Sequence, residues 1–378
     1  MANIVVLGTG MIGSAVALDL AEKHKVTTID VNKKALSDVQ AKNSAVETLV
    51  YDLQQNEDYT DVLAPFDLVV CAVPGFFGFE TLKKVLSAKK SVVDISFFPE
   101  NPFDLNYLAE QNGVFAIVDC GVCPGMSNVI LGYIDSQMDI SNYECLVGGL
   151  PQKKTWPFNY KAPFSAVDVI EEYVRPARMV KNGEIVVRPA LSDCELMEIQ
   201  RIGTMEAFNT DGLRTLIHTM PHIPNMTEKT LRYPGHAEYI QVLAKSGFFS
   251  TDMMEVDGMA FRPIDVTARI LKDNWKLKSS DEEFTVVRIT IEGDKNGKKR
   301  RCIYRMLDNG CSETKTSSMA RSTGYTATAI ANYVLDNNQN AGVLAPEHIG
   351  VQSGAYEYIF DYLMERQVEY RVEEFTLE

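Results

Sequence analysis

The sequence predicts an α/β protein with a doubly wound parallel sheet in its first part and a second, α+β part built on an open mixed or antiparallel sheet. Three observations predict this class. Short β-branched runs alternate with helix-like segments up to residue 119, a glycine-rich turn follows the first run, and the alternation ends after residue 125. Alternating strands and helices are typical of a parallel sheet with helices on both faces.

The first strand and the turn after it carry the strongest motif. Ile4-Val5-Val6-Leu7 has the composition of a buried strand, and Gly8-Thr9-Gly10-Met11-Ile12-Gly13 follows at once and opens a helix over residues 14–23. Gly8 allows a tight turn, Gly10 lets the backbone approach a pyrophosphate, and Gly13 allows helix and strand to pack closely. Met11 and Ile12 belong to this glycine run, just before the helix whose free N-terminal N–H groups favour an anion. This order predicts a dinucleotide site of the Rossmann type.

The second strand, residues 26–30, ends in an acid. Asp30 lies 20 residues after Gly10, where a carboxylate can accept hydrogen bonds from the ribose hydroxyls of an adenosine. A 2′-phosphate would meet a negative charge there. The sequence therefore predicts NAD as the cofactor rather than NADP.

Further strands are expected at residues 46–51, 66–73, 91–96 and 114–119, with helices at 34–42, 80–88 and 103–112. Ligands of such sheets bind at the carboxyl ends of the strands. The positions expected to line that crevice, besides the glycine turn and Asp30, are Asp52, Ala72, Val73, Pro74, Ser96 and Asp119. Asp52 either contacts the adenine end of the cofactor or is an exposed acid without a role.

The second part has a different pattern. Strands are expected at residues 143–147, 185–188, 284–292 and 299–307, and the last two flank a hairpin turn at 293–297. Helices are expected at 126–137, 211–220, 237–245 and 263–272, then a small-residue helix at 322–335 and a last helix at 355–366. This composition predicts an antiparallel, more exposed sheet covered by helices on one face.

Composition restricts the function. The chain has 378 residues, 46% hydrophobic and 23% charged, with a net charge of −14. An acidic chain is a poor partner for nucleic acid or an anionic membrane surface, because both require cations. We expect no membrane segment, no signal peptide and a cytoplasmic location, since no apolar run is long enough and the first residues enter a strand directly.

Cys120-Gly121-Val122-Cys123 raises the question of metal or redox chemistry. Zinc needs four ligands, and no second cysteine pair or suitably spaced histidine accompanies this one. We expect structural thiols and no metal site.

Residues 229–236 concentrate cations, a phenol and an imidazole around a turn, namely Lys229, Arg232, Tyr233 and His236. Arg232 can bind a carboxylate, and His236 or Tyr233 can move protons. A solvated surface loop explains the same composition equally well. Upstream, the polar residues 206–212 precede an expected helix, which Thr210 or Asp211 can cap.

Several of these runs resemble the saccharopine dehydrogenase-like oxidoreductases: residues 8–13, 119–128, 148–151, 208–213, 229–236 and 323–327, in that order. The resemblance implies an NAD-binding Rossmann domain at residues 1–122, a substrate domain at 123–322, and a C-terminal helical segment at 323–378 that returns to the first domain. It also implies a small-molecule amino-acid substrate and a homo-oligomer formed through the open sheet.

Three departures select a branch of this family. Cys123 stands where glutamate-forming members have an aspartate, Phe97 where they have a tyrosine, and Val147 where they have a cysteine. The loss of three polar groups favours oxidation of a free amine, and the branch implied oxidises the ε-amine of lysine with NAD to 2-aminoadipate 6-semialdehyde and ammonia.

Hydride leaves only from a neutral amine, so a base is required. The resemblance implies His236 as the base, Arg232 as the carboxylate ligand, and Lys229 and Tyr233 as alternatives for charge and proton transfer. It also implies Glu206 or Asp211 as an acid that meets an ammonium group. Two other functions stay open, a reductase that condenses an amine with an aldehyde or keto acid, and an NAD-binding protein without turnover.

Overall fold

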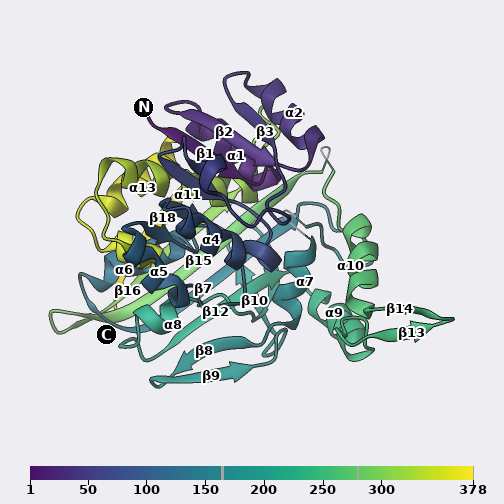
Figure 1. Ribbon diagram of the computed structural model, residues 1–378. Helices are drawn as coiled ribbons and strands as arrows, with labels where there is room; N and C mark the ends of the chain where they lie inside the picture. Colours follow the sequence, from purple (N-terminus) through teal and green to yellow (C-terminus); the bar gives the residue numbers. More distant parts are fainter. Residues whose placement is uncertain (163–165, 279–280, 378) are drawn as a thin grey trace. The chain divides into compact units, whose positions relative to one another are not determined.

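The computed structural model describes residues 1–162, 166–278 and 281–377 (Figure 1). The chain divides into two compact units, of which the first comprises residues 1–137 and 319–369 and the second residues 138–318 and 370–378. These bounds differ from the expected ones at two places. Helix α6 (Met126–Asp135) belongs to the first unit, and the last residues form strand β18 (Tyr370–Thr376) of the second unit rather than helix.

The first unit contains the expected parallel sheet, with strand order β17-β6-β5-β4-β1-β2-β3. Its central strands are β-branched and apolar and are buried on both faces, as in all parallel sheets covered by helices. The strands are β1 (Asn3–Leu7), β2 (Lys25–Asp30), β3 (Glu47–Val50), β4 (Leu68–Cys71), β5 (Val92–Asp94), β6 (Phe115–Ile117) and β17 (Gly342–Leu344). The fold-class prediction is confirmed, and β17 adds a seventh strand that the sequence did not reveal.

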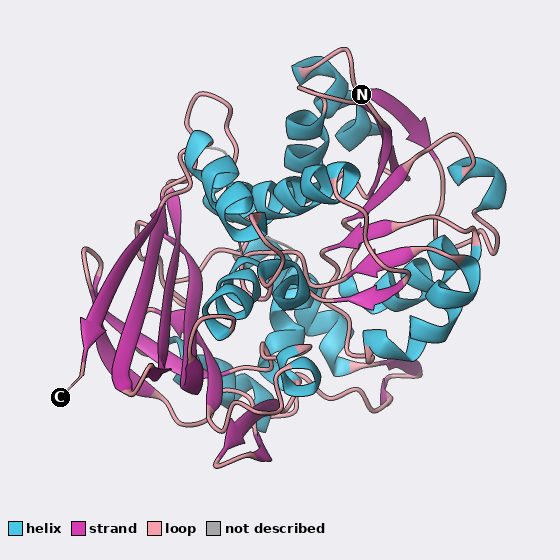
Figure 2. Cartoon of the chain, turned by 90° about the vertical axis from the view of Figure 1, so that its left-hand side faces the viewer, coloured by secondary structure: helices cyan, strands magenta, loops and turns pink. Residues whose placement is uncertain are grey.

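Helices lie on either side of this sheet (Figure 2). They are α1 (Met11–Leu20), α2 (Lys33–Lys42), α3 (Thr60–Leu63), α4 (Gly78–Ser87), α5 (Asn106–Asn112), α6, α11 (Ser318–Asp336), α12 (Pro346–Gly350) and α13 (Ala355–Glu365), with short 3-10 turns η1 (Gly75–Phe77) and η2 (Pro102–Leu105). The expected small-residue helix is α11. It packs against α1, because a Cβ on Gly324 would lie 3.4 to 3.7 Å from side-chain atoms of Val16, Ala15 and Ile12.

The second unit is built on a mixed sheet with the order β10-β11-β12-β7-β15-β16-β18, and β8 joins β12 to β9. The pair β12–β7 is parallel and the other pairs are antiparallel. The strands are β7 (Asp139–Pro151), β8 (Ala177–Lys181), β9 (Glu184–Arg188), β10 (Glu195–Ile199), β11 (Gly203–Asn209), β12 (Met226–Arg232), β15 (Glu283–Lys295), β16 (Lys298–Asp308) and β18. The expected hairpin turn joins β15 to β16 at Asn296-Gly297, where both residues have positive φ.

Four helices accompany this sheet: α7 (Ala166–Val174), α8 (Leu216–Thr219), α9 (His236–Lys245) and α10 (Pro263–Asn274). A small hairpin of β13 (Met254–Val256) and β14 (Met259–Phe261) extends away from α9 and α10 (Figure 1). The helix expected at residues 211–220 is reduced to the four residues of α8, and residues 210–215 form a loop.

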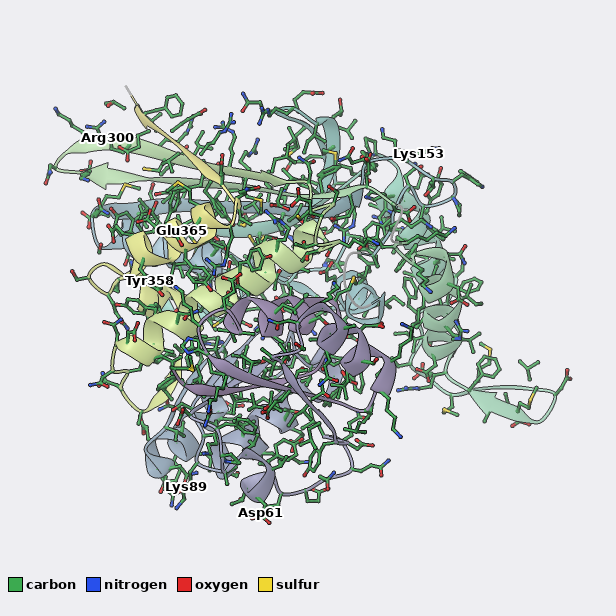
Figure 3. All side chains as sticks on the ribbon, turned by 90° about the horizontal axis from the view of Figure 1, so that it is seen from above. Asp61, Lys89, Lys153, Arg300, Tyr358 and Glu365 are labelled. Carbon is green, nitrogen blue, oxygen red and sulfur yellow. The ribbon has the colours of Figure 1, made fainter. Side chains whose placement is uncertain are left out.

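Charged side chains lie mainly at the surface. Figure 3 shows Asp61 and Lys89 projecting outward from the first unit, and both are exposed. Among the helices that the structure describes, none is both long and apolar enough to cross a membrane.

Candidate dinucleotide and substrate sites

The glycine turn of the first unit is shaped by close backbone contacts. Gly8 has a φ of +93°, and a Cβ there would lie 2.5 Å from the carbonyl oxygen of Ala72. A Cβ on Gly13 would lie 2.0 Å from the carbonyl oxygen of Gly8. Two of the three glycines are therefore required by the fold itself, because any side chain would push β1, β4 and α1 apart.

Gly10 differs from the other two glycines. A Cβ at this position would meet no atom within 4 Å, and its φ of −71° suits any residue. Gly10 precedes the first turn of α1, which contains Met11 and Ile12 and has no side-chain cap. A pyrophosphate needs backbone N–H groups and open space at such a helix start, so this turn fits the phosphates of a dinucleotide.

The Asp30 carboxylate lies directly beside this turn. Its Oδ2 atom accepts a hydrogen bond from the Thr9 N–H at 2.7 Å, and its Oδ1 atom accepts one from the Asn32 N–H at 2.8 Å. Asp30 is half-buried, so its remaining lone pairs stay accessible. A ribose diol fits this acceptor, whereas a 2′-phosphate would be repelled.

Other expected crevice residues have different surroundings. The Asp52 carboxylate accepts hydrogen bonds from the N–H groups of Gln54 and Gln55 at 2.9 and 3.2 Å, so it stabilises a turn after β3. Ala72 donates its N–H to Leu7 at 2.8 Å and abuts Gly8, which places Ala72, Val73 and Pro74 next to the glycine turn.

Ser96 and Asp119 are buried rather than open, with 2% and 3% of their surface exposed. They lie with Asp94, which is fully buried at the end of β5 and was not selected from the sequence. Burial raises the pKa of the Asp94 carboxyl to about 7, and the nearby charge of Asp119 acts in the same direction. Asp94 could have been found from the sequence as an acid that follows the apolar run Val92-Val93.

The two cysteines of the CxxC run do not form a disulfide. Cys120 is fully buried and donates its thiol to the carbonyl oxygens of Ile117 and Val118, and burial raises its pKa well above the usual range. Cys123 is half-buried. Within the described ranges, no group of three or more His, Cys, Asp or Glu side chains is arranged to hold a metal ion.

The four residues expected to form one catalytic cluster lie on opposite faces of the second sheet. Lys229 and Arg232 are on strand β12, not in a turn, and side chains alternate between the faces of a strand. Arg232 and His236 share the face that packs against α7. Lys229 and Tyr233 lie on the other face, where Tyr233 packs in a core with Leu231. The expectation of a single cluster is therefore wrong.

On the first of these faces, Arg232 and His236 are joined through a tyrosine. The Tyr173 hydroxyl lies 2.9 Å from His236 Nε2 and accepts a hydrogen bond from Arg232 Nε at 3.1 Å. Arg232 also donates to Glu172 at 3.4 Å, and its guanidinium lies 4.6 Å from the centroid of the Tyr160 ring. Arg232 is 2% exposed and His236 is 1% exposed, so this chain of hydrogen bonds is buried.

His236 is not suited to act as a base. Its Nδ1 atom donates to the carbonyl oxygen of Phe158 at 2.8 Å, which leaves Nε2 to accept from Tyr173. Burial lowers the pKa of His236 to about 3, and the positive charge of Arg232 adds to this effect. A neutral imidazole with both nitrogens engaged does not favour the expected base role, which stays a prediction from the sequence.

Lys229 and Tyr233 are also engaged. Lys229 forms an ion pair with Glu195 of β10, and its side chain is 14% exposed. The Tyr233 hydroxyl donates to the carbonyl oxygen of Pro151 at 2.9 Å, and burial raises its pKa. Neither residue lies on the face of Arg232, so neither is retained as a substitute for His236.

Strand β12 presents a buried polar row on the Arg232 face, formed by Glu228, Thr230 and Arg232. The Thr230 hydroxyl lies 2.9 Å from that of Thr210. The Oε2 atom of Glu228 has no hydrogen-bond partner within the described part of the chain, and burial raises the pKa of this carboxyl well above its ordinary value. A Cβ on Gly212 would lie 0.9 Å from Oε2, so only glycine leaves room for this acid.

Arginines surround the same row. Arg178 binds Asp211 through two hydrogen bonds of 2.8 Å, which occupies the carboxylate that was expected to meet an ammonium. Burial lowers the pKa of Arg175, and the positive charge of the nearby Arg214 acts in the same direction. Arg175 directly follows α7, a helix that the sequence did not reveal, and Arg178 lies on β8. Asp211 and Arg214 lie in the loop at 210–215. The buried polar row and its arginines are called the polar chamber below.

Glu206, the other acid expected to meet an ammonium, has a structural partner. Its Oε2 atom accepts a hydrogen bond from the N–H of Ala237 at 3.1 Å, at the start of α9. The polar chamber therefore contains acids and cations that the sequence pattern missed, chiefly Glu172, Glu228 and Arg214.

Comparison with known families identifies both parts of the chain. Residues 4–117 match the saccharopine dehydrogenase NADP binding domain, and residues 121–368 match the saccharopine dehydrogenase C-terminal domain. The second match alone covers more than half of the chain.

Curated relatives carry related names. The chain is 25% identical over 275 residues to saccharopine dehydrogenase (NADP(+), L-glutamate-forming) of Saccharomyces cerevisiae, covering 67% of this chain and 60% of the yeast protein. It is 22% identical over 267 residues to the mitochondrial alpha-aminoadipic semialdehyde synthase of Bos taurus, covering 66% of this chain and 29% of the bovine protein. These alignments thus span less than two thirds of either relative.

Structure comparison agrees on the fold. The chain resembles apo saccharopine dehydrogenase (L-Glu forming) from Saccharomyces cerevisiae with a TM-score of 0.76, 19% identity and coverage of 100% of both chains. With the dinucleotide turn, the mixed sheet and both family matches in agreement, the chain belongs to the saccharopine dehydrogenase family.

Proposed function

We propose that the chain is an NAD-dependent oxidoreductase that oxidises the ε-amine of L-lysine to 2-aminoadipate 6-semialdehyde and ammonia, the activity of a lysine 6-dehydrogenase. The feature that carries this proposal is the set Phe97, Cys123 and Val147, which stand where the family resemblance implies a tyrosine, an aspartate and a cysteine in glutamate-forming members. A free amine needs fewer polar contacts than a substrate that carries a glutamate moiety. Cytoplasmic location and assembly into a homo-oligomer remain predictions from the sequence.

The choice of NAD depends on Asp30. Its carboxylate is held beside the glycine turn by Thr9 and Asn32, at the position that a 2′-phosphate would approach. The matched family model is named for NADP, so this chain would differ from that pattern at the adenosine. When bound, NAD supplies the hydride acceptor.

The polar chamber supports an amino acid as the substrate. It offers arginines to a carboxylate and acids to an amine, and Arg214 and Glu228 among them are buried, where charge-assisted hydrogen bonds are strong. Tyr173 and Glu172 hold the Arg232 guanidinium, so we assign Arg232 the role of a fixed positive charge in the polar chamber. We assign Arg175 and Arg214 to binding the substrate carboxylate.

We assign the proton-accepting role to Glu228 in place of His236. A carboxylate with a raised pKa accepts a proton more readily than an ordinary one, and its unpartnered oxygen leaves a position for that proton. Replacing Glu228 by Gln is expected to lower kcat with lysine about hundredfold, whereas replacing the exposed Glu198 by Gln is expected to leave kcat unchanged.

A second candidate is a reductase that condenses an amine with an aldehyde or keto acid. The excess of arginines in the polar chamber favours a substrate with more than one carboxylate, and the yeast relative is named as a saccharopine dehydrogenase. Its predicted signature is the consumption of reduced cofactor only when two substrates are present.

One assay separates these functions. NADH formation is followed with NAD and a panel of diamines and amino acids, lysine first, and NADH or NADPH consumption is followed with 2-aminoadipate 6-semialdehyde plus glutamate. Turnover of lysine alone supports the proposal. Turnover only in the two-substrate direction supports the reductase, and binding of NADH without turnover of any substrate indicates a protein that only binds the cofactor.

A further inference from the structure

Three buried groups meet at the carboxyl ends of strands β4, β5 and β6. Cys71 ends β4, Asp94 ends β5, and Asp119 follows β6 with a φ of +57°. In a doubly wound sheet of this order, the half formed by β1, β2 and β3 holds the adenosine, and the half formed by β4, β5 and β6 holds the second nucleotide. Asp30 lies in the first half and Asp94 in the second.

Asp94 is fixed but incompletely paired. Its Oδ1 atom accepts a hydrogen bond from the Ser96 N–H at 2.8 Å, and its carbonyl oxygen accepts one from the Cys120 N–H at 2.9 Å. The Oδ2 atom is buried and has no hydrogen-bond partner among residues 1–162, 166–278 and 281–377. Helix α4 closes this side, because a Cβ on Gly78 would lie 2.7 Å from the Cβ of Ser96.

The titratable neighbours of Asp94 within the described chain are Cys71, Asp119 and Cys120. Burial raises the pKa of both thiols well above the usual range, so they stay neutral at physiological pH. Burial raises the pKa of Asp94 to about 7. Asp94 is therefore the residue among these three, Cys71, Asp94 and Cys120, whose charge changes near neutral pH.

We propose that Asp94 tunes the charge preference of the nicotinamide half of the site, so that its carboxylate favours the cationic ring of NAD⁺ over the neutral ring of NADH. The proposal rests on the proposed function, because it requires that the first unit bind NAD. The physical reason is that a nicotinamide ring carries one positive charge only in its oxidised form. A carboxylate removed from water is screened much less than a surface charge, so it distinguishes the two forms at short range.

Reciprocal linkage makes this proposal measurable. If ionised Asp94 attracts NAD⁺, then bound NAD⁺ lowers the pKa of Asp94, and binding near pH 7 releases a proton. NADH binding releases none. The affinity for NAD⁺ is expected to rise about tenfold between about pH 6 and about pH 8.5, and the affinity for NADH is expected to stay constant.

Isothermal titration calorimetry tests the proposal. NAD⁺ and NADH are titrated into the wild-type protein near pH 7 in buffers of different ionisation enthalpy, which gives the number of protons released. The same titrations use Asp94→Asn, the neighbouring Asp119→Asn and, as a matched control, the exposed Asp61→Asn. Proton release with NAD⁺ alone, retained in Asp61→Asn and lost in Asp94→Asn, supports the role of Asp94.

Three results would overturn the role. They are an NAD⁺ to NADH affinity ratio in the wild type that does not change with pH, proton release that persists in Asp94→Asn, and proton release that is lost only in Asp119→Asn. The wild-type ratio decides the matter even if Asp94→Asn does not fold. Failure of both nucleotides to bind the wild type would instead remove the proposed function, and this proposal with it, so the two failures are distinguishable.

Discussion

The Nε2 atom of His236 lies 2.9 Å from the hydroxyl oxygen of Tyr173. Tyr173 in turn accepts from Arg232, so a histidine, a tyrosine and an arginine from three parts of the second unit form one buried chain. The hydrogen bond to Phe158 fixes the direction of the others. Because Nδ1 donates to the Phe158 carbonyl, Nε2 accepts from the Tyr173 hydroxyl. This arrangement fixes the polar face of β12 and makes His236 a neutral residue.

The protonation state of His236 can be measured. The folded pKa is about 3 and the ordinary value is 6.5, so the unfolded chain binds a proton first as the pH falls. Stability from this residue is complete above pH 6.5 and is lost by roughly 1.4 kcal/mol per pH unit below it. Imidazole NMR should show His236 neutral in the folded protein at about pH 5. A His236 resonance that titrates near 6.5 would contradict the buried chain.

Two glycines of the dinucleotide turn should respond differently to alanine. Gly10→Ala is expected to change the free energy of unfolding by less than about 1 kcal/mol, since its Cβ meets no atom, yet to weaken NADH binding about tenfold. Gly13→Ala should destabilise the fold by about 1–3 kcal/mol, because its Cβ would lie 2.0 Å from a carbonyl oxygen. Urea unfolding and NADH fluorescence titration check both variants. Unchanged NADH binding by Gly10→Ala would disprove the assignment of Gly10 to the phosphates.

Asp30 should decide whether the protein binds NADH or NADPH more tightly. Asp30→Ser is expected to weaken NADH binding about tenfold or more and to improve NADPH binding, because it removes a charged acceptor of the ribose and a repulsive charge. Asp61→Ser, an exposed acid on α3, is the control and should change neither. The measurement is the ratio of the dissociation constants for NADH and NADPH in each variant. Tighter binding of NADPH by the wild type would refute the NAD assignment.

A buried ion pair ties the C-terminal helices to α1. Asp19 accepts a hydrogen bond from Arg366 Nε at 2.5 Å and from the Tyr362 hydroxyl at 2.7 Å, and its side chain is 5% exposed. Asp19→Ala is expected to lower the free energy of unfolding by about 3 kcal/mol, since it removes the most buried acidic partner of Arg366 and leaves the buried hydroxyls of Tyr362 and Thr328 without this acceptor. Asp38→Ala breaks the exposed pair with Lys34 and should cost about 0.5 kcal/mol or less. Equal effects in chemical denaturation would show that Asp19 has no special role.

The first unit was predictable because its signals are local. A buried parallel strand such as β4 is a continuous apolar run, and the glycine turn requires particular residues at fixed spacing. Strand β17 escaped prediction because three residues, Gly342–Leu344, carry no period, and its place in the sheet depends on pairing with β6 from a distant part of the chain.

The substrate side was less predictable because it depends on tertiary contacts. Lys229 and Arg232 are close in sequence, but the alternation of side chains along β12 places them on opposite faces. Tyr173 and Glu228 lie 55 residues apart in the chain and face the same chamber only because α7 packs on the sheet. Burial also lowers the pKa of His236, and a sequence alone does not show which histidine side chain will be buried away from water.

The source of the hydride tests the central claim most directly. The protein is supplied with NAD and L-lysine deuterated at the ε-carbon, and the nicotinamide product is analysed by mass spectrometry. Oxidation of the ε-amine predicts one deuterium on the reduced nicotinamide, with release of ammonia and 2-aminoadipate 6-semialdehyde. Reduced nicotinamide without deuterium, or no reduction of NAD by lysine although NADH binds, would contradict the proposal.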